Sequence, residues 1–193
     1  GSGKTLAFLY PLYQLIDPDA KGIQALILVP SRELGLQIEQ VWKKMGTNYK
    51  VNICYGGHNI DTEIKNLSSP PSVLIGTPGR IMDHMERESI DPETIKTLIL
   101  DEFDKSLQLG FHEQMSFIIS RLKNVDKRVL VSATNAIEIP KYTKISKPTT
   151  LNFISKNEES FSLLEVKKVV SEEKDKLNTL FHLICNLNSE AGI

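Results

Sequence analysis

The sequence has few cysteines and histidines and no long apolar run. It has 2 cysteines and 4 histidines among 193 residues, and their scatter along the chain indicates neither a disulfide framework nor a zinc site. No apolar run approaches the roughly 18 residues that a membrane-spanning helix needs, and the chain does not open with a signal-peptide pattern. We therefore expect a cytoplasmic protein in a reducing setting, with no membrane partner.

An excess of charge of either sign is also missing. Lysine and arginine together number 23 and the acidic residues 24, which gives a net charge of -1. This balance offers no global electrostatic argument for a nucleic-acid partner, so any anion binding must be local. Hydrophobic residues at 40% and charged residues at 24% are ordinary globular values, which argue against disorder and against a coiled-coil rod.

Short apolar runs alternate with segments that have helical periodicity. The runs are rich in leucine or β-branched residues, as in strands that are buried on both faces. They occupy residues 23–29, 51–54, 73–75, 98–100 and 129–131. This alternation predicts an α/β fold, a mostly parallel sheet with helices on both faces. Two of the helices are predicted at residues 4–16, with Pro11 inside, and at 31–45, with Ser31 as the N-cap.

The pattern changes after Thr134. We predict a last peripheral strand around Leu151, a linker at 153–162 and a strand at 163–170. Ser171 is a candidate cap for a final helix. That helix carries an apolar stripe, namely Leu177, Leu180, Phe181 and Ile184. Because one strand and one helix cannot bury a core, we interpret residues 163–193 as the opening of a second domain.

The chain opens with Gly1-Ser2-Gly3-Lys4-Thr5, which matches the second half of the phosphate-binding pattern G-x-x-x-x-G-K-[ST]. Glycine lets the backbone approach phosphate oxygens, and the following helix N-terminus attracts an anion. The lysine adds a positive charge, and the threonine hydroxyl can ligate Mg²⁺. Because the first half of the pattern is absent, these residues alone also fit a tag remnant in front of an amphipathic helix.

An acidic run, Asp101-Glu102-Phe103-Asp104, follows the predicted strand at 98–100. Ligands of open α/β sheets bind at the carboxyl ends of the strands. Beside a phosphate loop, an aspartate there can hold Mg²⁺, and a neighbouring glutamate can accept a proton from an attacking water. The alternative is that these acids only cap the next helix.

Four further segments stand at predicted strand ends: Pro30-Ser31-Arg32, Gly56-Gly57, Thr77-Pro78-Gly79-Arg80 and Ser132-Ala133-Thr134. Taken singly, helix capping and turns explain all of them. Taken together, exposed helix N-termini that each carry an arginine indicate a phosphate-binding strip along one edge of the sheet.

In this order, with about 100 residues between the lysine and the acid pair, the motifs resemble the DEAD-box family of ATP-dependent RNA helicases. The resemblance is to the first of the two RecA-like domains of that family and covers residues 1–152. It implies a RecA-like P-loop NTPase fold, followed by the linker and by the opening of a second RecA-like domain at 163–193. RNA-stimulated ATP hydrolysis coupled to local unwinding or remodelling of RNA is the implied activity.

The resemblance also implies roles for individual residues. Residues 1–5 would bind ATP, with Lys4 on its phosphates. Thr5 and Asp101 would hold Mg²⁺, partly through water, and Glu102 would position or deprotonate the hydrolytic water. Asp104 would hydrogen-bond to Ser132 and Thr134 and so couple the nucleotide site to RNA. The RNA backbone would be contacted, without sequence preference, by Arg32, Gly57, Thr77, Gly79 and Arg80.

The sequence departs from the family at three places. Phe103 stands where the family has alanine, so we expect a compensating pocket for the ring. Ser31 replaces the usual threonine, which keeps the cap. Asn135-Ala136 follow Thr134 where methionine and proline are usual, so we expect a different loop.

The resemblance further implies that the adenine-recognising Q motif precedes residue 1. It also implies that the second domain supplies the arginines that stabilise phosphoryl transfer. We therefore expect this chain alone to be nearly inactive. Two alternatives stay open: a P-loop NTPase that acts on DNA or a small molecule, and a non-enzymatic RNA clamp or assembly factor with the same fold.

Overall fold

The computed structural model describes residues 3–134, 138–152, 168–171 and 175–187. The chain divides into two compact units, Gly1–Pro148 and Thr149–Ile193. The loop at 135–137, for which we expected a departure from the family, lies outside the described residues. Within the described part of the chain, no helix has both the length and the apolar character needed to cross a membrane.

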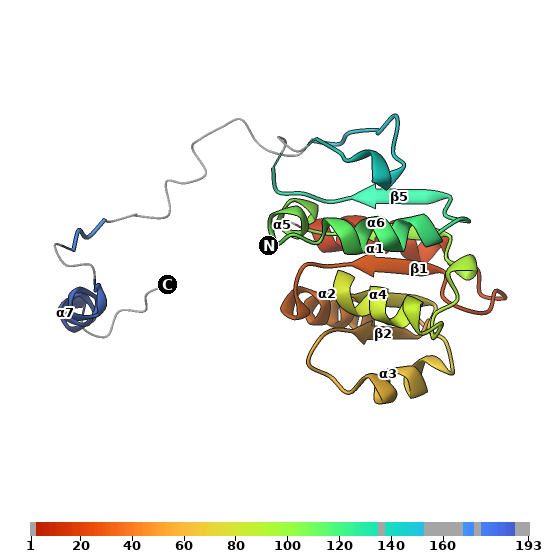
Figure 1. Cartoon of the computed structure of the whole chain (residues 1–193), viewed down its shortest axis with the longest axis horizontal. Coiled ribbons are helices and arrows are strands. Elements are labelled where there is room, and N and C mark those ends of the chain that lie inside the picture. The colour runs from red at the N-terminus through yellow and green to blue at the C-terminus, as the bar shows by residue number, and fades with distance from the viewer. Residues whose placement is uncertain (1–2, 135–137, 153–167, 172–174, 188–193) are drawn as a thin grey trace. The chain divides into compact units, whose positions relative to one another are not determined.

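The first unit is built on a five-stranded sheet (Figure 1). The strand order is β2-β3-β1-β4-β5, and every neighbouring pair is parallel. The strands are β1 (Ala25–Leu28), β2 (Val51–Cys54), β3 (Val73–Gly76), β4 (Thr97–Leu100) and β5 (Lys127–Leu130). The five strands predicted between residues 23 and 131 are therefore confirmed, and their ends differ from the predicted ones by at most two residues.

Helices cover both faces of the sheet, as predicted. They are α1 (Lys4–Leu15), α2 (Arg32–Lys44), α3 (Ile60–Leu67), α4 (Pro78–Glu86), α5 (Phe103–Gln108) and α6 (His112–Arg121). Two short 3-10 helices are also present, η1 (Pro92–Thr94) before β4 and η2 (Lys141–Thr143) after β5. Apolar residues of α1 and α2 form one core cluster with the sheet, and those of α3 to α6 form a second.

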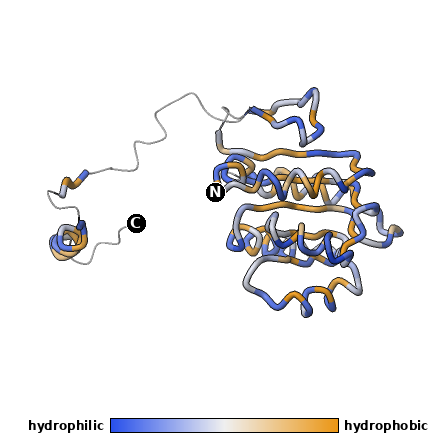
Figure 2. Tube along the Cα trace, viewed as in Figure 1, coloured by the Kyte–Doolittle hydropathy of each residue, from blue (hydrophilic) through white to orange (hydrophobic). Residues whose placement is uncertain are grey.

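Burial explains why the three central strands are continuously apolar. Every residue of β1, β3 and β4 is buried, because each strand has a neighbour on both sides and helices above and below. The tube in Figure 2 shows this concentration of apolar residues along the strands. At the edge of the sheet, β5 alternates between exposed and half-buried residues. Its first residues are polar, so the search for apolar runs did not include them in the predicted strand.

The capping prediction for the second helix is confirmed. The Ser31 hydroxyl oxygen accepts a hydrogen bond from the backbone N–H of Leu34 at 3.3 Å. This bond satisfies one of the free N–H groups of the first turn of α2. Helix α1 runs through Pro11 without a break from Lys4 to Leu15.

Two expectations for the second unit are wrong. Leu151 is not in a strand, and it is 75% exposed. Ser171 does not cap the final helix α7 (Leu177–Leu187), because it lies too far before the first turn. Asp175 accepts the hydrogen bond from the Leu177 N–H instead, while Ser171 contacts Thr179.

The predicted strand at 163–170 falls largely outside the described residues, and Lys168–Val170, which are described, are not in a strand. The predicted linker at 153–162 is also outside them. The apolar stripe of α7 is exposed, as the side chains of Leu177, Leu180, Phe181 and Ile184 all are.

Gly76 ends β3 where the backbone packs too closely for a side chain. A Cβ atom there would lie 2.9 Å from the carbonyl oxygen of Cys54 and would clash with the Ile81 side chain. Gly76→Ala should therefore destabilise the chain by about 1–3 kcal/mol, measured by urea denaturation. The control is Gly79→Ala, because a Cβ atom built at Gly79 would have no neighbouring atom within 4 Å. An equal loss in both variants would contradict the packing argument.

Candidate functional site

All five strands are parallel, so their carboxyl ends meet at one edge of the sheet. In the register, Leu28 pairs with Gly76 on one side and with Leu100 on the other, and Leu100 pairs in turn with Leu130. The segments that follow these residues are the ones that the sequence singled out. The sheet therefore places the candidate motifs along a single edge.

The first part of the site is the start of α1. Gly3 has a left-handed backbone with φ of 74° and stands at the N-cap, with no atom within 4 Å of where a Cβ would be. The first turn of α1 contains no acidic residue. The helix N-terminus therefore offers positive polarity in open space, next to the exposed Lys4 and the half-buried Thr5. Gly1 and Ser2 lie outside the described residues.

The second part is the acidic pair after β4. The Asp101 N–H donates to the Leu28 carbonyl at 2.9 Å, and the Phe103 N–H donates to the Val131 carbonyl at 3.0 Å. These bonds hold the turn against β1 on one side and against the end of β5 on the other. Glu102 between them has φ of 44°, a left-handed conformation that is rare for a residue with a side chain. Such local strain is often found at functional sites.

Lys4 lies close enough to Asp101 for its charge to act on that carboxylate. Burial raises the pKa of Asp101, whose side chain belongs to a residue only 5% exposed. The N–H of Glu102, which donates to Asp101 Oδ1 at 2.9 Å, and the positive charge of Lys4 both oppose this rise. The start of α1 and the end of β4 therefore lie near each other, although about 100 residues separate them in the sequence.

Glu102 has a partner that the sequence analysis missed. Its Oε2 atom lies 2.9 Å from Nζ of Lys105, one turn along α5, and this contact raises the pKa of Lys105. The spacing of three residues on a helix was the available signal. Both side chains are substantially exposed, so the pair is weak and can open to release the carboxylate.

Asp104 is joined to the segment after β5. The Thr134 hydroxyl donates to Asp104 Oδ2 at 3.3 Å, and the Ser132 hydroxyl donates to the Thr134 carbonyl at 3.0 Å. Ser132 thus reaches Asp104 through Thr134 and not by the direct bond that we expected. The other carboxylate oxygen of Asp104, Oδ1, is buried without a hydrogen-bond partner.

Phe103 fits the site without displacing the acids beside it. Its ring is 2% exposed and belongs to the core cluster that α3 to α6 form with the sheet. The pocket that we expected for the larger side chain is therefore present. The two carboxylates on either side of Phe103 keep the contacts described above.

A groove of about 470 Å³ lies along the same edge of the sheet. Four of the five predicted RNA-binding residues line it, namely Arg32, Thr77, Gly79 and Arg80. Gly57 has φ of 90° and directly follows Gly56, which does line the groove. The Thr77 hydroxyl makes no capping hydrogen bond. It therefore stays available to a ligand.

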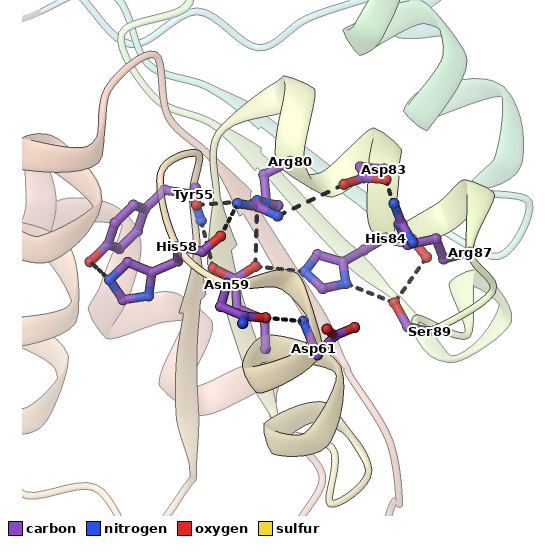
Figure 3. Close-up of polar contacts among 10 residues, drawn as sticks. Tyr55, His58, Asn59, Asp61, Arg80, Asp83, His84, Arg87 and Ser89 are labelled. Carbon is purple, nitrogen blue, oxygen red and sulfur yellow. Dashed lines mark hydrogen bonds and ion pairs between the residues drawn. The ribbon is translucent and has the colours of Figure 1, made fainter.

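The two groove arginines differ in their surroundings. Arg32 is exposed, and its guanidinium carbon lies 4.8 Å from the ring centroid of Tyr55, a residue that the sequence analysis missed. Arg80 is largely buried and donates to the carbonyl oxygens of Tyr55 and His58, at 3.2 Å and 2.7 Å (Figure 3). Arg32 is thus the more accessible cation.

The residues at the start of α1 and after β4 suit a magnesium ion. Thr5 offers a hydroxyl and Asp101 a carboxylate, and Mg²⁺ prefers oxygen ligands of this kind. Asp101 is held in place by the hydrogen bond from its backbone N–H to β1. The positive charge of Lys4 lowers its pKa in part and so favours the ionised carboxylate. These two side chains are the candidate metal-binding residues.

The raised pKa of Asp101 predicts a stability effect. The folded chain holds this proton more tightly than the unfolded chain, so ionised Asp101 destabilises the fold at pH 7. The penalty is absent below the unfolded pKa of about 4. Asp101→Asn should therefore be more stable than wild type at pH 7 in urea denaturation, with a gain that shrinks as the pH falls towards 4. The exposed Asp126→Asn is the control, and a gain that does not change with pH would refute the assignment.

Comparisons with known proteins agree with this architecture. A family model described as DEAD/DEAH box helicase matches residues 1–141. The DEAD-box ATP-dependent RNA helicase CshA of Bacillus licheniformis is 32% identical, and the match covers 100% of this chain and 40% of that protein. The ATP-dependent RNA helicase eIF4A of Neosartorya fischeri is 37% identical, with 95% and 47% covered.

The fold has a solved counterpart as well. The crystal structure of a DEAD box protein from the hyperthermophile Methanococcus jannaschii aligns with a TM-score of 0.65 and 35% identity, and covers 72% of this chain and 37% of that one. The chain thus spans less than half the length of these relatives. With its RecA-like parallel sheet and the match over residues 1–141, the chain belongs to the DEAD/DEAH box helicase family.

Proposed function

We propose that this chain is the first RecA-like domain of a cytoplasmic ATP-dependent RNA helicase. The observation that carries the proposal is that the open N-terminus of α1, with Lys4, lies near the buried Asp101 at the edge of the sheet that also holds the groove. A cation and a buried carboxylate at a helix N-terminus suit a magnesium-bound polyphosphate. The relatives named as ATP-dependent RNA helicases support the same assignment.

In this proposal, residues 1–5 hold the phosphates of ATP, and the Lys4 ammonium neutralises part of their charge. Thr5 and Asp101 hold Mg²⁺, which when bound supplies further charge neutralisation on the phosphates. Glu102 leaves Lys105 and orients the attacking water or accepts its proton. Its turn is fixed from two neighbouring strands, so the carboxylate is positioned before the substrate arrives.

Asp104 and Thr134 connect two of the segments that form the site. They join the turn after β4, which carries the acid pair, to the segment after β5. The buried Oδ1 atom of Asp104 has room for one more donor. We propose that a rearrangement of Ser132 supplies it when the nucleotide and RNA are both bound, which would couple the two sites.

RNA would lie in the groove along the same edge. Arg32, Gly57, Thr77, Gly79 and Arg80 would lie along its sugar-phosphate backbone, which would meet a cation, a hydroxyl and exposed protein backbone. Such contacts carry no base sequence information, as a helicase that acts on many RNAs requires. Hydrolysis would then drive local unwinding or remodelling of a short duplex.

A second RecA-like domain would complete the active site. The relatives are more than twice as long as this chain, and residues 163–193 are proposed as the opening of that domain. Its arginines would stabilise the charge that develops in phosphoryl transfer. ATP would close the two domains over a bent RNA strand, and hydrolysis would release it.

The proposal predicts that the 193-residue chain hydrolyses ATP slowly even with RNA present. We expect a turnover roughly 10³ to 10⁵ times below that of a protein with both RecA-like domains, because arginines supplied from outside the nucleotide site are worth about this much in related NTPases. Steady-state phosphate release by the two proteins side by side measures the ratio. Comparable rates would contradict the need for a second domain.

The proposal also predicts that RNA and not DNA activates hydrolysis. In the two-domain protein, single-stranded RNA should stimulate ATP turnover, while DNA of the same sequence should not, because ribose hydroxyls are part of what is recognised. Glu102→Gln should lower the stimulated rate by about 10²-fold or more, as expected when a general base is lost. Asp126→Asn is the carboxylate control away from the site.

The outcome separates the alternatives. Equal stimulation by DNA would favour a P-loop NTPase that acts on DNA, and hydrolysis without any nucleic acid would favour a small-molecule substrate. RNA binding with a rate that Glu102→Gln leaves unchanged would favour the non-enzymatic clamp.

A further inference from the structure

A buried cluster of polar side chains lies behind the groove, and its acid and imidazole are part of no motif that the sequence analysis singled out. Glu63 of α3 and His84 of α4 are 4% and 0% exposed and lie 2.8 Å apart, and Glu63 also lies beside Arg80. His84 and Arg80 are labelled in Figure 3. Burying a carboxylate costs free energy unless it is paired and hydrogen-bonded. The partners of the buried Glu63 carboxylate therefore show how this cost is offset.

Glu63 uses both of its carboxylate oxygens. Oε2 accepts a hydrogen bond from Nε2 of His84 at 2.8 Å and lies 3.6 Å from Nε of Arg80. Oε1 accepts from the backbone N–H of Tyr55 at 3.4 Å. On the far side of the imidazole, Nδ1 of His84 lies 2.7 Å from the Ser89 hydroxyl. Helix α3 is thereby tied to α4 and to the end of β2.

Arg80 extends this cluster to the loop that borders the groove. Its guanidinium donates to the carbonyl oxygens of Tyr55 and His58, which stand on either side of Gly56-Gly57. A third contact, at 3.8 Å, reaches the Asp83 carboxylate. One planar cation therefore bridges both ends of a glycine loop, and two carboxylates offset its charge.

Tyr55 is the point at which these contacts converge. Its N–H is held by Glu63 and its carbonyl oxygen by Arg80, so both sides of its backbone are fixed. Its hydroxyl contacts Nε2 of His58 at 2.9 Å, and its ring supports the Arg32 guanidinium. The place of the exposed arginine thus depends on a carboxylate that never reaches the groove.

A metal ion is a poor alternative for the same cluster, although Cys54, Glu63 and His84 have ligand atoms within 4.8 Å of one another. Burial, together with the charge of Glu63, raises the pKa of Cys54 to about 12, so its thiol keeps its proton. Both imidazole nitrogens already have partners, and the Arg80 cation borders the carboxylate. A cation would have to displace these contacts.

We propose that Glu63, paired with His84, is a positioning residue for RNA binding that acts through Arg80. It holds the guanidinium against the Tyr55–His58 loop and so sets the groove and the place of Arg32. Arg80 contributes chiefly by shaping this loop, and Arg32 supplies the cation that meets a phosphate. The inference rests on the proposed RNA site and adds residues to it.

RNA affinity and its salt dependence test this in the 193-residue chain. Glu63→Gln and Arg80→Lys should each weaken binding of a fluorescent single-stranded RNA by about tenfold. Neither should change the slope of log affinity against log salt, because no phosphate contact is lost. Arg32→Ala should lower that slope by about 0.7, the value for one phosphate on a single strand. Asp61→Asn, an exposed carboxylate on the same helix, is the control and should match wild type.

The double variant shows whether Glu63 acts through Arg80. Glu63→Gln combined with Arg80→Lys should bind RNA no more weakly than the weaker single variant, since both break the same clamp. Hydrogen exchange of the backbone amides at 55–58 should be faster in both single variants than in wild type. This second readout does not depend on RNA.

Each combination of results has a meaning. RNA affinity that is unchanged in Glu63→Gln, or exchange that is unchanged at 55–58, overturns the inference. Arg80→Lys binding that stays near wild type, with a lower slope in Arg80→Ala, also overturns it and makes Arg80 a direct phosphate contact. If neither wild type nor the two-domain protein binds RNA but the loop exchange is faster in the variants, the clamp stands and the proposed function fails. Added Zn²⁺ that stabilises wild type but not Cys54→Ser would replace the clamp with a metal site.

Discussion

The whole site depends on the burial of the Asp101 carboxylate beside Lys4. Burial raises the pKa of this group, which costs stability, and the fold compensates only in part through the Glu102 N–H and the lysine charge. A second positive ion at the same place would relieve the rest of the cost. A cation would stabilise a carboxylate buried at the end of a central strand, which is why we propose that a polyphosphate with Mg²⁺ binds here.

The same edge of the sheet carries both proposed sites because all five strands are parallel. The acid pair follows β4, the hydroxyls follow β5, and the groove lies beyond the ends of β1, β2 and β3. Adjacent strands place these segments side by side, and Asp104 with Thr134 forms a direct bond across one of the junctions. In the proposed function, a change at the nucleotide site would reach the groove through the adjacent strand ends, which the sheet holds side by side.

Much of the fold followed from periodicity, whereas side-chain partners did not. Continuous apolar runs mark strands that are buried on both faces, and the sequence predicted all of these strands. It also predicted the edge of the sheet along which the motifs lie. The predictions that failed concern elements without such burial. Leu151 is exposed and pairs with no strand among the described residues, and Ser171 lies too far before α7 to cap it. The pairing of Arg80 could not be read from the chain, because Glu63 lies 17 residues away on another helix and is marked only by its burial.

The convergence of Lys4 and the acid pair on one polyphosphate is tested most directly by paramagnetic NMR. Mn²⁺ replaces Mg²⁺ with ATP, and the amide signals of the chain are followed as the complex is added. Signals of residues 3–6 and of 101–104 should broaden together, at the same concentration, while those of Asp61 and Asp126 stay sharp. Broadening of only one of the two segments, or of neither, would contradict a shared phosphate and metal site.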